Sequence, residues 1–251
     1  MNPKQISSFK SQRAEELLTL YKLLQNEFGA SVNSLDPLMQ AYNTLQKDAE
    51  TKKNTTIWGY KITNLILPLG VNRHIIPTDI NSLRVRIDCN VVCDMNNWGE
   101  LNDPFESYNF AIIIFGEKDS TRFSICWHID KDDGRESNEH HPLYHIQYSD
   151  GVNHFGKNED SFNWGHVIYL DSPRIAHYPM DIILGIGFYL TNFHQKGKFE
   201  DFLNNHSFRR LYTQSKNNIL KPYFLNLTSH WNDSPRNPIW NESNILCPHL
   251  C

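Results

Sequence analysis

The sequence predicts an α+β protein in which an antiparallel β-meander of four to six strands packs against an N-terminal helical hairpin and C-terminal helices. Three observations carry this prediction. Apolar residues recur at three- and four-residue steps before residue 54, they alternate with polar residues between residues 82 and 148, and helical spacing returns after residue 181. Separate runs of helical and strand periodicity favour this class over alternating strand–helix units.

Two helices are expected at the N-terminus. Residues 8–28 carry apolar side chains at helical spacing, and Gly29 supplies a stop. The second helix is expected to begin with Asp36 as its N-cap and Pro37 in its first turn. The connection between them is short, so the pair should form a hairpin.

The sheet is expected from strand-like runs joined by polar connections. Residues 83–91 alternate apolar and polar side chains, and residues 108–115 are apolar on both faces, which is typical of a central strand. The four main predicted strands are residues 83–91, 108–115, 123–129 and 143–148. Weaker strands at residues 57–67 and 166–170 would extend the sheet.

The C-terminal part should begin with a proline-framed loop, residues 173–181. A helix with Pro179 and Asp181 in its first turn follows, and its lack of a polar face predicts burial against the sheet, on the same face as the N-terminal hairpin. Gly185 and Gly187 within it are expected to permit close packing, because glycine otherwise weakens a helix. A further helical stretch, residues 198–220, is expected to end at Pro222.

Length and composition limit the classes of protein to which the chain can belong. A chain of 251 residues with 39% hydrophobic and 12% aromatic content can bury a sizeable core, which excludes disorder over most of its length. We divide it into a hairpin (1–53), an α+β core (54–230) and a C-terminal arm (231–251). A net charge of −4 does not indicate a nucleic-acid partner, although a local basic face would still permit one.

The sequence predicts a cytoplasmic, bacterial protein with no membrane partner. Its longest apolar run, residues 180–190, is shorter than the roughly 20 residues that a membrane span needs, and the N-terminus lacks the pattern of a secretion signal. Five cysteines are an odd and sparse set, which favours a reducing compartment.

No standard catalytic or cofactor motif is present. Nucleophile elbows, phosphate-binding glycine loops and zinc-protease motifs are absent, and no metal site or cofactor can be identified. Cys126 lies between apolar neighbours on a predicted strand, which favours a structural thiol over a nucleophile.

Histidines form the most unusual feature of the sequence. Seven of the twelve fall within residues 128–177. Residues opposite each other on paired strands have Cβ atoms about 5 Å apart, so His128, His145 and Asp130 are expected to converge on one sheet face. If the protein is an enzyme, these three are the catalytic candidates, because imidazole titrates near neutral pH. The alternative is an ordinary solvated sheet face.

Candidate binding residues fall in two groups. Arg84, Arg86, Arg122 and Gln147 are predicted on the same sheet face as the histidines, where arginine could hold a phosphate. Arg174 and His177 lie in the loop of residues 173–181, whose prolines fix an extended path. For this loop the alternative is a rigid crossover that seals the sheet.

Two resemblances bear on function. The runs HPLYHIQ (141–147), PRI (173–175) and PMD (179–181) resemble a pattern in uncharacterised bacterial proteins, some of them beside phage-defence genes. The order of helix, four-stranded meander, proline-rich crossover and helices is similar to that of ubiquitin-conjugating enzymes. No cysteine lies between Cys126 and Cys247, so the thioester-forming residue that this second resemblance would imply is missing.

The leading hypothesis is an accessory protein of a bacterial defence or toxin module that acts by binding a protein partner or a second copy of itself. Aromatic content and the absence of catalytic motifs favour it. One alternative is a nuclease or phosphodiesterase toxin that uses His128 and His145, with Arg122 or Arg174 on the phosphate. Another is a non-catalytic fold of the ubiquitin-conjugating kind. Whether the chain is an enzyme stays open.

Overall fold

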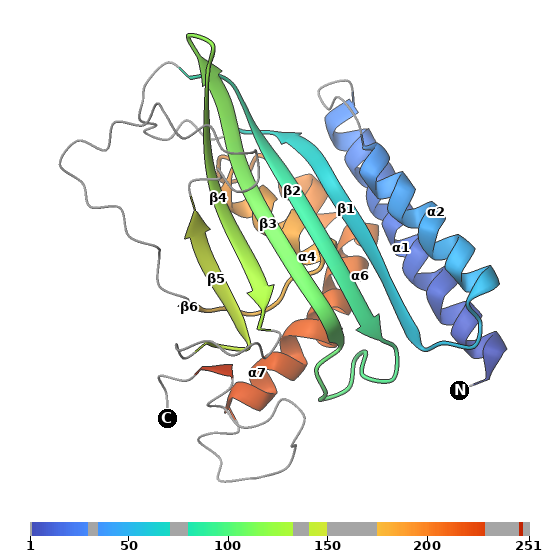
Figure 1. Ribbon diagram of the computed structural model, residues 1–251. Coiled ribbons are helices and arrows are strands. Elements are labelled where there is room, and N and C mark those ends of the chain that lie inside the picture. Colours follow the sequence, from blue (N-terminus) through green and yellow to red (C-terminus); the bar gives the residue numbers. More distant parts are fainter. Residues whose placement is uncertain are drawn as a thin grey trace.

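The computed structural model describes residues 2–29, 35–70, 80–132, 141–149, 175–228 and 246–247. It confirms the predicted class: a helix pair precedes a six-stranded antiparallel meander whose strands pair in chain order, and further helices follow (Figure 1). The strands are β1 (Ile57–Pro68), β2 (Asn81–Asp94), β3 (Phe105–Lys118), β4 (Thr121–Lys131), β5 (Tyr144–Ser149) and β6 (Ile175–Ala176). The helices are α1 (Pro3–Phe28), α2 (Asp36–Thr51), α4 (Ile182–Asn192), α5 (Glu200–Asn204), α6 (His206–Ser215), the π-helical η2 (Lys216–Leu220) and α7 (Lys221–Thr228).

Helix α1 begins at Pro3, before the predicted start at residue 8. The Asn2 side chain accepts a hydrogen bond from the Gln5 backbone N–H (3.0 Å), and the Gln5 side chain accepts one from the Asn2 backbone N–H (2.9 Å). This capping box satisfies the first backbone donors, and Pro3 fits the first turn. Gly29 ends the helix with φ 47°, as predicted.

Helix α2 begins one residue earlier than predicted. Leu35 occupies the N-cap position without a side-chain hydrogen bond, and Asp36 lies in the first turn. The prediction of Asp36 as the N-cap was therefore wrong. Its carboxylate at this end of the helix still interacts favourably with the helix dipole.

Strand alternation gives the sheet two faces of different character. The apolar face is built from side chains such as Ile87 on β2, Phe110 on β3 and Ile129 on β4, which are at most 2% exposed. The polar face carries the alternate residues. Its members on the inner strands include Arg84, Arg86, Asp88, Asn109, Ala111, Ile113, Arg122, Cys126, His128, Asp130, His145 and Gln147.

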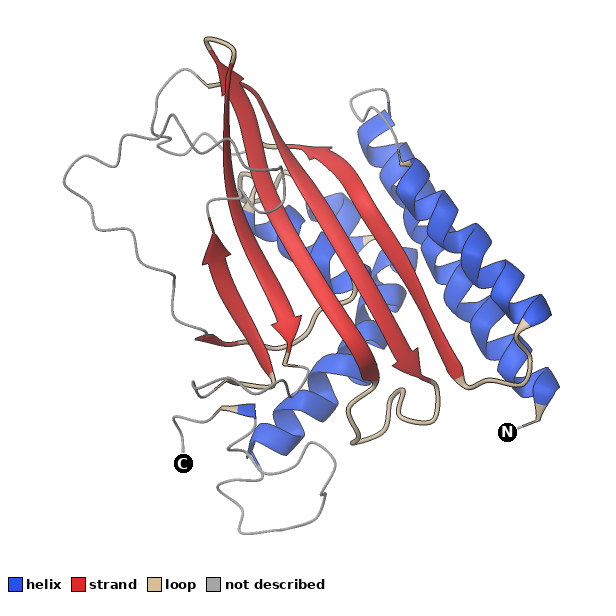
Figure 2. Ribbon diagram, in the orientation of Figure 1, coloured by secondary structure: helices blue, strands red, loops and turns tan. Residues whose placement is uncertain are grey.

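Helices cover the apolar face. In Figure 2 the C-terminal helices lie behind the sheet, and the α1–α2 hairpin runs along its β1 side. The apolar face, the hairpin and the C-terminal helices contribute to one hydrophobic core, which contains Leu17, Leu38, Trp58, Phe110 and Ile183. Among the described residues, no helix is both long and apolar enough to cross a membrane.

Helix α4 packs closely on its neighbours through two glycines, as predicted. A Cβ atom on Gly185 would lie 2.5 Å from the Phe110 ring, and one on Gly187 would lie 2.4 Å from the Tyr212 ring. The start of α4 differs from the prediction, because Asp181 is the N-cap rather than a first-turn residue and Pro179 precedes it. The Asp181 carboxylate accepts hydrogen bonds from Leu184 N (2.8 Å) and Ser215 Oγ (2.7 Å).

Two further predictions about the C-terminal part need correction. The predicted loop contains a short strand, since β6 pairs with β5 through Ile175 and Ala176. The helical stretch does not end at Pro222, because α7 continues to Thr228. Pro222 directly follows the π-helical turn η2, where the regular hydrogen-bond pattern of the helix already changes. Strand β1 confirms the weaker predicted strand at residues 57–67, whereas the one at residues 166–170 lies outside the described residues.

Candidate functional site

The polar face brings the three predicted catalytic residues together with Gln147. In the register of β4 and β5, His128 lies opposite Gln147, and Asp130 lies opposite His145. The shared face follows from the two-residue period of a strand. Their proposed catalytic roles stay predictions, and the contacts of each ring determine what the group can do.

His128 is held between two oxygen acceptors. Its Nε2 lies 3.2 Å from Gln147 Oε1 and 3.2 Å from Asp130 Oδ2. Because both oxygens accept hydrogen bonds, we assign a proton to Nε2. Asp130 also accepts a hydrogen bond from the Asn109 side chain. This network orients the His128 ring and commits Nε2 to donating rather than to removing a proton.

His145 is buried, with 6% of its surface exposed. Its Nδ1 lies 3.3 Å from the Pro142 carbonyl oxygen, and its ring centroid lies 5.7 Å from that of His141. A carbonyl oxygen only accepts, so Nδ1 carries a proton. The two histidines of the enzyme hypothesis therefore lie on one face of the sheet. The burial of His145, however, leaves a substrate little access to its ring.

The arginines predicted to bind a phosphate have protein contacts of their own. Arg86 Nε donates to Asp88 Oδ1 (3.0 Å), and the pair is bidentate. Asp88 also accepts from the Asn64 backbone N–H (2.7 Å), at the irregularity of β1 where Asn64 has φ 62°. Arg122 lies 5.2 Å from the centre of the Phe115 ring. Arg86 and Asp88 therefore stabilise a bulge in the neighbouring strand.

Among the described contacts, that of Arg84 is local: its Nη1 donates a hydrogen bond to the Leu83 carbonyl oxygen (3.2 Å). Arg174 lies outside the described residues. The predicted phosphate-binding set is therefore not assembled at one point within the part of the chain that the structure describes. Each of these arginines keeps its binding role as a prediction.

His177 lines an apolar pocket that sequence reasoning missed. The pocket, about 270 Å³, lies between the apolar face and the end of α4. Such a concave, apolar site with a few polar groups is typical of binding sites. It is lined by Phe110, Ile112, Trp127, Ile129, Ile146, His177, Met180, Phe188, Asn192 and Phe193.

The ring of His177 can offer a hydrogen-bond acceptor to this pocket. Its Nδ1 lies 2.7 Å from the Tyr178 carbonyl oxygen, so Nδ1 carries a proton. Burial lowers the pKa of His177, and the ring is therefore neutral near pH 7. A neutral ring with its proton on Nδ1 keeps a lone pair on Nε2.

The cysteines of the sheet are buried. Cys126 is 0% exposed, in agreement with the predicted structural thiol. Burial raises the pKa of the Cys89 and Cys93 thiols well above the ordinary value, which disfavours the nucleophilic thiolate. Within the described ranges, no group of three or more His, Cys, Asp or Glu side chains could hold a metal ion.

Only the shared face of the histidines could be anticipated from strand periodicity. The pocket needs α4 docked on the sheet, and the sole signal for it was the continuous apolar character of residues 182–190. Comparisons of the chain with protein-family models, curated proteins and solved structures give no match. The two resemblances of the sequence therefore stay predictions.

Proposed function

We propose that this protein is a binding module whose partner protein inserts an aromatic side chain into the pocket beside His177. The observation that carries the proposal is the pocket itself, a concave apolar site with a neutral histidine in its wall. A tryptophan or tyrosine of the partner would suit it, because each combines a large apolar ring with a donor for His177 Nε2.

Exposed apolar side chains around the pocket favour a protein over a small molecule. Ile175, on the apolar face beside Ile146, is 57% exposed, and Tyr148, next to Trp127, is 46% exposed. Phe224 is 44% exposed and lies 5.8 Å from the Tyr178 ring. Exposed apolar surface of this kind, extending beyond a pocket, is typical of interaction sites between proteins.

The contacts of the polar face support binding over hydrolysis. Hydrolysis by a histidine pair needs both rings accessible to one substrate. His145 is 6% exposed, and His128 Nε2 already donates to neighbouring side chains. The accessory role in a defence or toxin module remains part of the proposal as the context in which such a partner would be found.

The test is to co-express the chain with the products of its neighbouring genes and to measure the affinity of any purified complex by calorimetry. Ile175→Asp should weaken the complex at least about tenfold, because it places a charge beside Ile146, which lines the pocket. Ile57→Asp is the matched control, since Ile57 is 38% exposed on β1, at the opposite edge of the sheet.

A second pair of variants tests the proposed hydrogen bond from the partner to His177 Nε2. His177→Phe should weaken the complex about tenfold, the size of one hydrogen bond. His177→Gln, which keeps an acceptor, should restore part of the affinity. If no complex forms, or if the Ile57 and Ile175 variants weaken it equally, the proposed function is wrong.

A further inference from the structure

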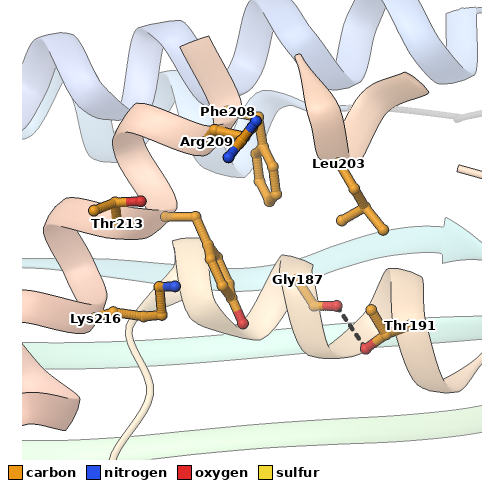
Figure 3. Close-up of a pocket in the computed structure, with 8 residues that line it drawn as sticks. Gly187, Thr191, Leu203, Phe208, Arg209, Thr213 and Lys216 are labelled. Carbon is orange, nitrogen blue, oxygen red and sulfur yellow. Dashed lines mark hydrogen bonds between the residues drawn. The ribbon is translucent and has the colours of Figure 1, made fainter. Parts of the chain in front are cut away.

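A second site lies on the other side of α4, in a groove against α6. The groove has a volume of about 240 Å³, and Figure 3 draws the residues that line it. On α4, Gly187 and Thr191 face this groove, whereas Phe188 and Asn192 line the pocket beside His177. The two sites are therefore separate. The groove is lined by Gly187, Thr191, Leu203, Phe208, Arg209, Tyr212, Thr213 and Lys216.

The groove is positive in a chain that is negative overall. Its lining includes Arg209 and Lys216 and, among the described residues, no carboxylate. Residues 202–228 contain four Lys or Arg and no Asp or Glu, against a net charge of −4 for the whole chain. Neither Arg209 nor Lys216 has a carboxylate within 4.0 Å in the described structure.

Helix geometry places the two cations along one side of the groove. Arg209, Thr213 and Lys216 are spaced four and three residues apart, so they share one face of the helical segment. Seven residues of α-helix span about 10 Å, and Lys216 leans back toward Thr213, which lies between the two cations along the chain. The helix changes to a π-helix at Lys216, and π-helical turns occur frequently at functional sites.

An aromatic wall completes the groove. The Tyr212 ring stacks on Phe208, with ring centroids 5.7 Å apart, and Lys216 Nζ lies 5.3 Å from the Tyr212 ring centre. Glycine at position 187 leaves room for the Tyr212 ring, because a Cβ atom there would lie 2.4 Å from that ring. Thr191 Oγ1 donates to the Gly187 carbonyl oxygen (2.9 Å; Figure 3). Leu203 adds a second apolar surface.

We propose that this groove binds a small phosphate monoester whose organic group is aromatic. Arg209, Lys216 and the Thr213 hydroxyl contact the phosphate, and Tyr212 and Leu203 contact the organic group. A phosphate monoester carries nearly two negative charges and three acceptor oxygens at neutral pH, so it matches two cations and a hydroxyl better than a carboxylate does. The proposal is independent of the partner pocket.

Phenyl phosphate is the probe, titrated into the full chain by calorimetry at low salt. Benzoate and inorganic phosphate serve as comparisons, because the first keeps the ring with a weaker anion and the second keeps the anion without the ring. Phenyl phosphate should bind at least about tenfold more tightly than either, and its affinity should fall as salt is added. Absence of binding, or equal affinity for benzoate, would overturn the proposal.

Matched variants locate the site. Arg209→Gln and Lys216→Gln should each weaken phenyl phosphate binding at least about tenfold, because each removes a charged hydrogen bond. Arg210→Gln and Lys221→Gln remove neighbouring cations that do not line the groove, and they should change the affinity less than about twofold. If all four variants weaken binding equally, the attraction is diffuse and the groove is not the site.

Discussion

The two faces of the sheet are buried by different means, although they are built from the same strands. On the apolar face, side chains such as Ile87 and Phe110 are buried by helices from both ends of the chain. On the polar face, side chains bind each other, as in the contacts of His128 with Asp130 and Gln147. The burial of apolar side chains under the helices needs no particular orientation. Polar contacts, in contrast, require each donor to meet an acceptor.

Each face also contains a small exception. The polar face holds a cluster of Ala111, Ile113 and Cys126, all 0% exposed. On the apolar side, the joint of α1 with α4 contains Glu16, whose Oε1 lies 2.7 Å from Arg13 Nη2, near the buried Asp181. These exceptions allow the comparison to be tested with matched variants.

The largest effect is expected from Ile87→Ala on the apolar face. This change should destabilise the protein by about 3 to 4 kcal/mol, because the surrounding core cannot collapse into the cavity. Ile113→Ala, its counterpart on the polar face, should cost about 1 to 2 kcal/mol, since its cluster has three members within the described part of the chain. Denaturant unfolding of both variants measures the difference. Equal losses would show that the two faces are packed equally tightly.

The second prediction concerns Glu16 and pH. Burial raises the pKa of Glu16 to about 7, with Asp181 adding to the rise and Arg13 and Arg210 opposing it. The folded protein therefore holds a proton that the unfolded chain has released, and stability falls as pH rises from about 4.5 through 7. The loss attributable to Glu16 is up to about 3 kcal/mol.

Glu16→Gln removes this titration. At pH 5 the wild-type side chain is already neutral, so the variant should be similar in stability. At pH 8 the variant should be more stable than the wild type. Unfolding by denaturant at both pH values checks the prediction, and an unchanged difference between the two pH values would contradict it.

The smallest effect is expected for Arg84 on the polar face, and the buried His145 on the same face serves as its comparison. His145→Ala should lower stability by about 1 to 3 kcal/mol, because His145 is buried and its contact with Pro142 would be lost. Arg84→Ala should change it by less than about 0.5 kcal/mol, since its contact is local. Thermal melts compare them. A His145 variant of unchanged stability that has lost an activity would revive the catalytic hypothesis.

Local periodicity was sufficient to predict which residues share a face. The alternation of residues 83–91 placed Arg84 and Arg86 on one side of β2, and the same two-residue period placed His128 and His145 together. The start of α1 was predicted too late because the capping box of Asn2 and Gln5 precedes the first apolar repeat.

The sequence by itself determined the class of fold, the order of the main helices and strands, and which residues of the alternating strands share a face, because these depend on neighbours along the chain. Only the tertiary structure decided that Phe188 lines a pocket while Gly187 opens onto a groove. Both lie on one apolar helix, and their surroundings depend on how α4 docks between the sheet and α6. It likewise decided that His177 meets the apolar face, because this contact depends on how the elements pack.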